Sequence, residues 1–410
     1  MTKINSELPV ILIDTSYWLY YRFFSLRNWY TYAYPENYVS GESTMTNTNF
    51  NANHNWLEDE LFMTKYKKLF VDNIKKICKK FKTKLENVIL CIDCPHNEIW
   101  RHIKVKTENE KINIKNEIIQ QKKIDREKEK VEREKIDVEK IDVESDDEKI
   151  DKEIEEAIIE NIKPYKGTRL DSHKKNNFNS FNIFNYMKTT FIPTIKDNNN
   201  NTIKILYCSK CEADDIIGQL SVYIDTQWKI QASNSNGEGT SNNHKKIYIL
   251  ANDNDYLQVC NNNIRLINGI GKIISGNKGE NYYGDKYLLS KILLGDKSDN
   301  IKSCTIDSGY LHSGIPNNKI KNVTKKCIEI IFANPDKYTI FNTLLNDIRN
   351  NKELYINDNS ISNGISNGIS NGISNGIDIN IFTHNCNMMD FQMLPQDLKQ
   401  NLYTLFNQII

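Results

Sequence analysis

Short apolar runs alternate with helix-forming stretches along the first 270 residues of the chain. Runs of five or six mostly apolar residues occupy 9–13, 87–92 and 246–250, and a weaker run occupies 263–267. β-Branched runs bounded by polar residues are typical of buried strands in a parallel sheet. Residues 61–81 carry apolar side chains at helical spacing, with lysines on the opposite face. This alternation predicts an α/β fold with a mostly parallel sheet.

Three tracts interrupt this pattern. Residues 104–163 hold 15 Lys and Arg against 20 Asp and Glu, residues 232–244 are rich in Ser, Asn and Gly, and residues 361–377 repeat Ile-Ser-Asn-Gly. Such compositions cannot bury a packed core, so we predict solvated insertions. For 104–163 an exposed helix with a sparse apolar seam is the alternative.

The tracts divide the chain into four parts. We expect an α/β domain at 8–270 that carries the 104–163 insertion, a helical domain at 271–350, a repeat loop at 351–380 and a C-terminal helical segment at 381–410. No run of about 18 apolar residues is present, which excludes a membrane-spanning helix. The polar start leaves no room for a signal peptide, and no presequence is visible, although an Arg-poor presequence would be hard to recognise. Nine scattered cysteines indicate a reducing, intracellular compartment.

Aspartates follow three of the predicted strands. Asp14, Asp93 and Asp253 each stand just after an apolar run. A single aspartate in this position is most often a turn residue or a helix N-cap. Ligands, however, bind at the carboxyl ends of the strands in an open parallel sheet. Three aspartates in the same structural position therefore indicate a site.

Further carboxylates occur in three short segments. Residues 212–215 place three acids at a predicted helix start, more than a cap needs, and acidic pairs occur at 253–255 and 296–299. The last segment lacks the spacing of an EF-hand. The candidate metal ligands are Asp14, Asp93, Glu212, Asp214, Asp215, Asp253, Asp255, Asp296 and Asp299. Oxygen-only ligands select Mg2+ or Mn2+, and a pair of such ions suits phosphodiester hydrolysis.

Four motifs, in order, resemble those of the 5'-3' exonucleases of bacteria and phages. They are residues 14–24 after the first strand, 212–218 (Glu-Ala-Asp-Asp-Ile-Ile-Gly), 253–258 (Asp-Asn-Asp-Tyr-Leu-Gln) and 295–301 (Gly-Asp-Lys-Ser-Asp-Asn-Ile). This family includes the nuclease domain of bacterial DNA polymerase I and belongs to the flap-endonuclease superfamily. The resemblance implies a resolvase-like or PIN-like parallel sheet with a helical arch, followed by a small helix-hairpin-helix domain.

The resemblance also implies two metal sites. Asp14, Asp93, Glu212 and Asp214 would hold the ion beside the attacking water. Asp253, Asp255, Asp296 and Asp299 would hold the second ion, and Asp215 would support both. We expect two Mg2+ ions, with Mn2+ able to substitute.

Residues 165–169 (Tyr-Lys-Gly-Thr-Arg) are similar to a segment at the base of the family's arch. The resemblance implies that Lys166 and Arg169 contact the reacting phosphate and act in catalysis with Asp14 and Asp214. The implied DNA contacts are Arg22, Arg101, Tyr165, Lys166, Arg169 and Gly314. Without the resemblance, the segment would read as a surface turn.

The chain departs from the family pattern at two places. The charged tract 104–163 separates Arg101 from Tyr165, and only residues 313–317 resemble the glycine-rich turn of the DNA-binding hairpin. Pro316 removes a backbone donor from that turn, which argues against the K+ ion that the family often binds there.

Two Cys-x-x-Cys pairs suggest a second kind of site. Cys91 and Cys94 flank the end of a predicted strand, and Cys208 and Cys211 precede the acidic helix start. Four thiols fit a tetrahedral zinc site on paper. Buried thiols are the ordinary interpretation, because neither pair stands on a loop.

We therefore predict a monomeric, metal-dependent 5'-3' exonuclease or 5'-flap endonuclease. It would act on DNA with 5' ends or flaps in replication or repair, in the nucleus or a DNA-containing organelle, and away from membranes. One alternative is a non-catalytic DNA-binding protein that kept the fold, although crowded carboxylates without metal would repel one another. A second is a PIN-like ribonuclease, a group with fewer acids and no 295–301 motif. A third is a phosphatase acting on small nucleotides, which would leave the 165–169 segment and the arch unexplained.

Overall fold

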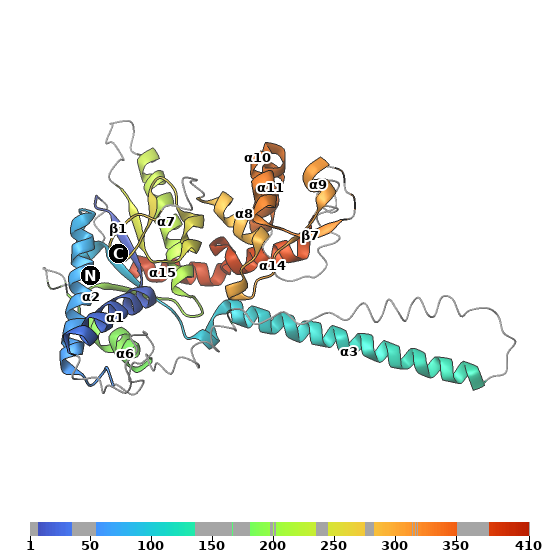
Figure 1. Cartoon of the computed structure of the whole chain (residues 1–410), viewed down its shortest axis with the longest axis horizontal. Helices are drawn as coiled ribbons and strands as arrows, with labels where there is room; N and C mark the ends of the chain where they lie inside the picture. The colour runs from blue at the N-terminus through green and yellow to red at the C-terminus, as the bar shows by residue number, and fades with distance from the viewer. Residues whose placement is uncertain are drawn as a thin grey trace.

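The computed structural model describes residues 7–34, 55–135, 166, 181–196, 200, 202–234, 245–274, 283–313, 315, 317, 319–350 and 377–409. Within them the chain forms an α/β body, a smaller helical body and one long projecting helix (Figure 1). Residues 136–163 of the predicted insertion 104–163, residues 235–244 of the predicted insertion 232–244 and residues 361–376 of the repeat lie outside the described residues. None of the described helices is long and apolar enough to span a membrane.

The α/β body is built on one parallel five-stranded sheet, which confirms the predicted fold class. The strand order is β3-β2-β1-β4-β5, and every neighbouring pair runs parallel. The strands are β1 (Val10–Asp14), β2 (Val88–Ile92), β3 (Lys204–Tyr207), β4 (Ile247–Leu250) and β5 (Ile264–Ile267). From β1, the strands β2 and β3 are added on one side and β4 and β5 on the other, so the strand order switches between β1 and β4. Ligands of open parallel sheets bind at the carboxyl ends of the strands beside such a switch point.

Helices cover both faces of this sheet. One face packs on α1 (Thr15–Ala33), α2 (Glu60–Lys80) and α6 (Phe181–Tyr186), and the other on α7 (Ala213–Asn234) and α15 (Gln396–Ile409). Within β1, Ile11 and Ile13 lie in the first cluster and Val10 and Leu12 in the second. All four are fully buried, as the period-two alternation of a doubly covered strand requires.

The helical body follows β5. Its apolar core joins helices α8 (Asp285–Leu294), α10 (Lys325–Ala333), α11 (Pro335–Asn350) and α14 (Ile379–Met389). Strands β6 (Thr305–Asp307) and β7 (Ile320–Asn322) pair antiparallel around α9 (Ser308–Ser313). The buried Asp307 carboxylate accepts hydrogen bonds from the backbone N–H groups of Gly309, Tyr310 and Asn317. One side chain therefore organises the segment in which the sequence predicts a DNA-binding hairpin.

Short turns of 3-10 or π-helix connect these elements. They are η2 (Leu85–Asn87), η3 (His96–Glu98), the π-helical η4 (Met187–Phe191), η5 (Ile192–Thr194), η7 (Asn254–Val259), η9 (Lys297–Asp299) and η10 (Phe391–Met393).

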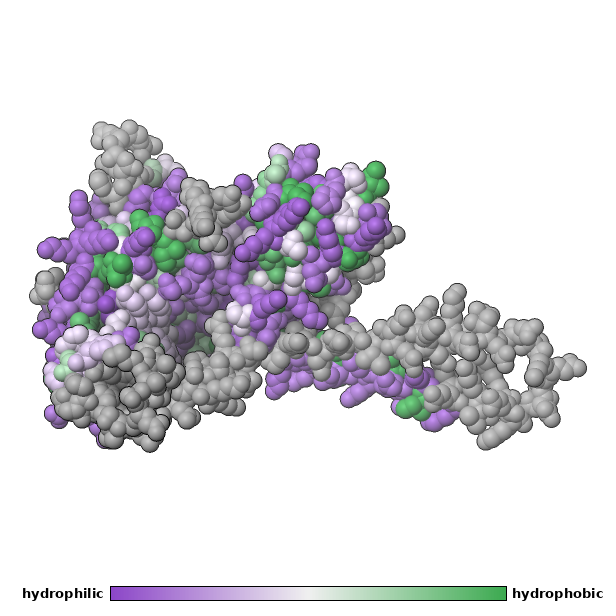
Figure 2. Space-filling model, in the orientation of Figure 1, coloured by the Kyte–Doolittle hydropathy of each residue, from purple (hydrophilic) through white to green (hydrophobic). Residues whose placement is uncertain are grey.

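Helix α3 (Trp100–Lys135) projects away from both bodies for most of its 36 residues (Figure 1). Near its start, Val105 packs into the core of the helical body. Farther out, the described side chains are mostly charged and exposed, and hydrophilic colour follows this part of the helix in Figure 2. The first half of the charged tract is thus helical and solvated, except at its base.

The structure differs from the sequence prediction at two points. Strand β3 was not predicted, because Lys204 interrupts its apolar run; the lysine is buried and its Nζ donates to the Glu86 carbonyl at 2.6 Å. The C-terminal segment, predicted as a separate part at 381–410, contributes to both bodies. Helix α14 lies in the core of the helical body, and α15 packs on the sheet.

Candidate metal centre

The three strand-end aspartates lie along one edge of the sheet. Strand β1 lies between β2 and β4, so Asp14 is flanked by Asp93 on one side and Asp253 on the other. Asp14 also caps α1, because its Oδ1 accepts a 2.9 Å hydrogen bond from the backbone N–H of Tyr17. The strand-to-helix turn therefore fixes this carboxylate at the sheet edge.

The start of α7 adds a second acidic cluster beside these aspartates. One oxygen each of Glu212, Asp214 and Asp215 lies within 4.8 Å of the other two. The backbone N–H of Ala213 donates to Asp93 Oδ1 at 2.8 Å, which ties the end of β2 to this helix start. The segment that the sequence singled out by its excess of acids thus meets the strand ends.

Arg101 is buried beneath this cluster, with only 1% of its surface exposed. Its Nη1 lies 3.1 Å from Glu212 Oε2, and its Nη2 lies 2.7 Å from Asp215 Oδ1. Trp100 Nε1 donates to Asp215 Oδ2 at 3.0 Å. Arg101, predicted to contact DNA, is therefore occupied inside the protein, where it orients two acidic side chains.

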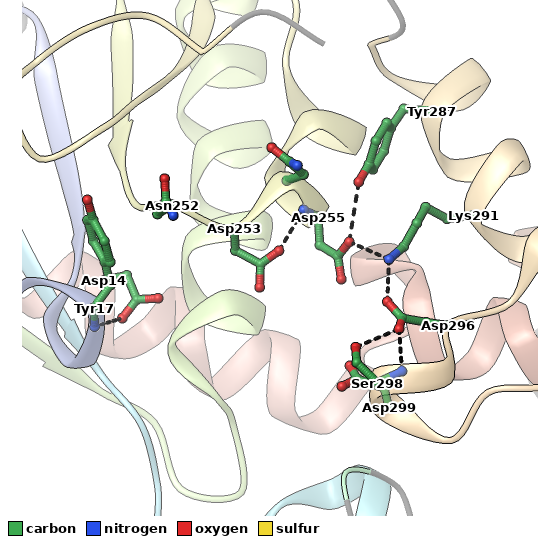
Figure 3. Close-up of a pocket in the computed structure, with 11 residues that line it drawn as sticks. Asp14, Tyr17, Asn252, Asp253, Asp255, Tyr287, Lys291, Asp296, Ser298 and Asp299 are labelled. Carbon is green, nitrogen blue, oxygen red and sulfur yellow. Dashed lines mark hydrogen bonds and ion pairs between the residues drawn. The ribbon is translucent and has the colours of Figure 1, made fainter. Parts of the chain in front are cut away.

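A third acidic group lines a cavity of about 500 Å3 at the same edge (Figure 3). Its walls come from both bodies, and the acidic lining residues are Asp14, Asp253, Asp255, Asp296 and Asp299. A narrower space is lined by Asp214 together with the last three of these. Six of the nine predicted carboxylates thus line these two spaces, and Asp93, Glu212 and Asp215 lie beside Asp214 at the start of α7.

The loop that carries Asp296 and Asp299 is held closed by its own backbone. Asp296 and Ile301 exchange two backbone hydrogen bonds, at 2.9 and 2.8 Å. Gly295 precedes them with a φ of 68°, and an added Cβ would lie 2.5 Å from the carbonyl carbon of Lys302. Only glycine fits this position without strain.

Burial and like charge raise the pKa of several of these groups. Burial, followed by the charge of Asp93, raises the pKa of Asp14 to about 7. Burial and Asp214 raise the pKa of Glu212 to about 7, against the opposing effect of Lys166 and Arg101. Burial and Asp255 raise the pKa of Asp253 to about 6. Ionised carboxylates are therefore unfavourable here without cations, and a donor set of oxygens alone fits hard divalent ions.

Three lysines supply part of the missing positive charge. Lys166 Nζ lies 2.8 Å from Glu212 Oε1, and its backbone N–H donates to the Asp299 carbonyl at 3.3 Å. Lys188 Nζ donates to Ser16 Oγ at 2.9 Å, and Ser16 in turn donates to Asp93. Lys291 contacts two carboxylates of the third group.

Lys188, Ser16 and Lys291 were not predicted from the sequence. Each is a common surface residue type at its helical position, and no spacing pattern connects it to an acid far away in the chain. Lys166 was predicted, although as a contact of the substrate phosphate.

The other predicted DNA contacts are only partly described. Arg22 stacks over the rings of Trp18 and Tyr21, at 4.1 and 4.5 Å from the ring centroids. Its Nη2 donates to the carbonyl of Gly269 at 2.5 Å. Tyr165, Arg169, Gly314 and Pro316 lie outside the described residues, so their roles stay predictions.

The two Cys-x-x-Cys pairs show no zinc site in the described part of the chain. All nine cysteines are free and buried. Within the described residues, the potential metal-ligand side chains that lie close together in a group of three are Glu212, Asp214 and Asp215, at the start of α7.

Among known proteins, the chain matches solved structures but no family model or curated sequence. The solved structures that it matches include structures of the 5'-exonuclease of bacteriophage T5. A mutant of that enzyme is 10% identical with a TM-score of 0.40, covering 98% of this chain and 99% of that one.

Two further T5 structures match at similar levels. The 5'-exonuclease with bound zinc ions is 11% identical with a TM-score of 0.38, covering 98% of this chain and 100% of that one. A flap endonuclease pseudo-enzyme–product complex with DNA and metal ions is also 11% identical with a TM-score of 0.38, covering 98% of each chain.

Proposed function

We propose that the protein is a structure-specific 5' nuclease that hydrolyses DNA phosphodiester bonds with two divalent cations. The observation that carries the proposal is that carboxylates from three adjacent strand ends, a helix start and a tight loop gather at one edge of the sheet, beside a cavity that five of them line. Such a concentration of oxygen ligands is unusual for a purely structural role, because the groups repel one another when ionised.

The residues divide into three functions. Asp14, Asp93, Glu212 and Asp214 would hold one cation, and Asp253, Asp255, Asp296 and Asp299 would hold the other. Bound there, the cations would lower the pKa of a water molecule and offset charge on the scissile phosphate. Lys166, beside Glu212, would contact the phosphate, as would Arg169. Asp215 and Arg101 would position Glu212 through the buried ion pairs.

The test uses labelled DNA with a 5' flap, a nick or a single-stranded 5' end, in the presence of Mg2+ or Mn2+. We expect cleavage of at least one of these substrates and none in EDTA. Asp214→Ala should lower the rate by at least a hundredfold, because a metal ligand is lost. Asp397→Asn, at an exposed position in the first turn of α15, is the matched control and should retain wild-type activity.

The outcomes separate the alternatives. A protein that binds these DNAs but cleaves none of them with either metal would be a non-catalytic DNA-binding protein. Cleavage of an RNA version in preference to DNA would favour a ribonuclease. Activity that survives Asp214→Ala would contradict the assignment of the site.

A further inference from the structure

A lysine of the helical body lies among the carboxylates of the third acidic group. Lys291 stands in the last turn of α8, and its Nζ is 3.0 Å from Asp255 Oδ1 and 2.5 Å from Asp296 Oδ2. Figure 3 shows the ammonium nitrogen reaching both carboxylates from the α8 side. Asp255 belongs to the α/β body and Asp296 to the loop after α8, so one side chain joins the two bodies.

This arrangement is partly shielded from water. The side chains of Lys291, Asp255 and Asp296 are 24%, 32% and 21% exposed. Opposite charges at these distances attract more strongly here than on an open surface, where screening by water removes most of the effect. Asp296 also accepts hydrogen bonds from the N–H and hydroxyl of Ser298, at 2.8 and 2.6 Å. Lys291 and Ser298 therefore both hold the Asp296 carboxylate in the loop after α8.

The position of the ammonium matters for metal binding. A divalent ion shared by Asp255 and Asp296 would approach the same carboxylate oxygens that Lys291 contacts. The second acidic cluster, at the start of α7, differs, because Lys166 approaches Glu212 at 2.8 Å but lies 3.9 Å from Asp214. An ion at the third group would thus have to break two short contacts to a lysine.

We infer that Lys291 is the internal cation of the third acidic group in the metal-free protein, and that a divalent ion binds there by displacing its ammonium from Asp255 and Asp296. The inference rests on the proposed function, since it takes these carboxylates as metal ligands. Lys291 would then set the affinity of the second ion. Loading of that site would be weaker than its carboxylates alone would provide.

Calorimetric titration of Mn2+ into the full-length, metal-free protein without DNA tests this role. Lys291→Met removes the charge and keeps the length of the side chain, whereas Lys291→Arg keeps the charge. Lys229→Met is the matched control, because Lys229 Nζ lies 2.8 Å from Asp225, a carboxylate outside the site. We expect Lys291→Met to raise the affinity of the weaker binding event about tenfold, or ~1.4 kcal/mol. Lys291→Arg and Lys229→Met should keep the wild-type affinity.

The same variants give a second readout in thermal melting. Without metal, Lys291→Met should melt below the wild type, because two carboxylates lose their cation. Added Mn2+ should raise its melting temperature more than that of the wild type. Lys291→Gln repeats the measurement with a neutral side chain that can still donate hydrogen bonds, in case the methionine variant does not fold.

Two results would overturn the role of Lys291. One is an unchanged or weaker second binding event in both neutral variants. The other is an equal gain of affinity in Lys291→Arg, which would show that charge is not responsible. Failure of the proposed function looks different, since the wild type itself would then bind no divalent ion and leave DNA with 5' ends intact.

Discussion

The buried Arg101 offers the sharpest test of how this site is held together. Its guanidinium makes three hydrogen bonds to carboxylates, at 3.1, 3.0 and 2.7 Å, and a fourth to the carbonyl of Met388 at 3.0 Å. Replacement by methionine keeps much of the side-chain volume and removes all four hydrogen bonds. Glu212 and Asp215 would then remain in a buried position without their main cation.

The expected loss is large because the partners cannot reach water. Asp215 is fully buried, and Glu212 is 7% exposed. Removing one partner of a buried ion pair typically destabilises a protein by about 3–5 kcal/mol, since the remaining charge is uncompensated. For a body of this size, that corresponds to a decrease in melting temperature on the order of 10 °C. The expectation applies to the metal-free protein.

Urea unfolding followed by circular dichroism, in EDTA at pH 7.5, measures this change. The control is Lys128→Met on the same helix, whose partner Asp125 is 3.9 Å away and whose side chain is 72% exposed. Exposed pairs contribute about 0–1 kcal/mol, so the control should unfold almost like the wild type. If Arg101→Met lost less than about 1 kcal/mol, or no more than the control, the burial and pairing of Arg101 would not have the energetic role argued here.

Three further predictions address individual residues. The pKa of Asp14 is raised from 3.8 to about 7, chiefly by burial and then by the charge of Asp93. The folded state therefore favours the protonated carboxyl, and the free energy of unfolding decreases as the pH rises from about 4 to about 7. In EDTA, Asp14→Asn should therefore melt above the wild type at pH 8 but not at pH 4; the same difference at both pH values would refute this. Gly295→Ala should lower the free energy of unfolding by at least about 2 kcal/mol in urea, because of its positive φ and the close approach of Lys302. An alanine variant as stable as the wild type would show that the loop can relax. Asp307→Ala should lose about 2–4 kcal/mol and speed amide exchange in α9, since several N–H groups lose their acceptor; unchanged exchange there would count against this role.

The sequence predicted the site residues best where acidic side chains directly follow a strand. The apolar runs at 9–13, 87–92 and 246–250 became β1, β2 and β4, and the acids placed after them reached one edge because parallel strands share a direction. The excess of acids at 212–215 indicated a helix start, and α7 begins there. These features depend on residues close together in the chain.

Strand β3 shows the limit of that reasoning. Its run contains Lys204, which reads as a solvent-facing residue until the carbonyl of Glu86 is known to lie 2.6 Å from its ammonium. A buried lysine is favourable only with such an acceptor, and the acceptor is 118 residues away. Periodicity alone cannot reveal a partner at that separation.

The cations of the site show the same division. Hydrophobic pattern and strand direction determined, from sequence alone, that carboxylates would gather at one edge of a parallel sheet. Only the tertiary structure decided that Arg101 lies beneath Asp215, that Lys291 joins Asp255 to Asp296, and that α14 and α15 contribute to both bodies. The physical reason is that an ion pair depends on the distance between two side chains in space, whereas a sequence pattern reports only which face of its own element each side chain occupies.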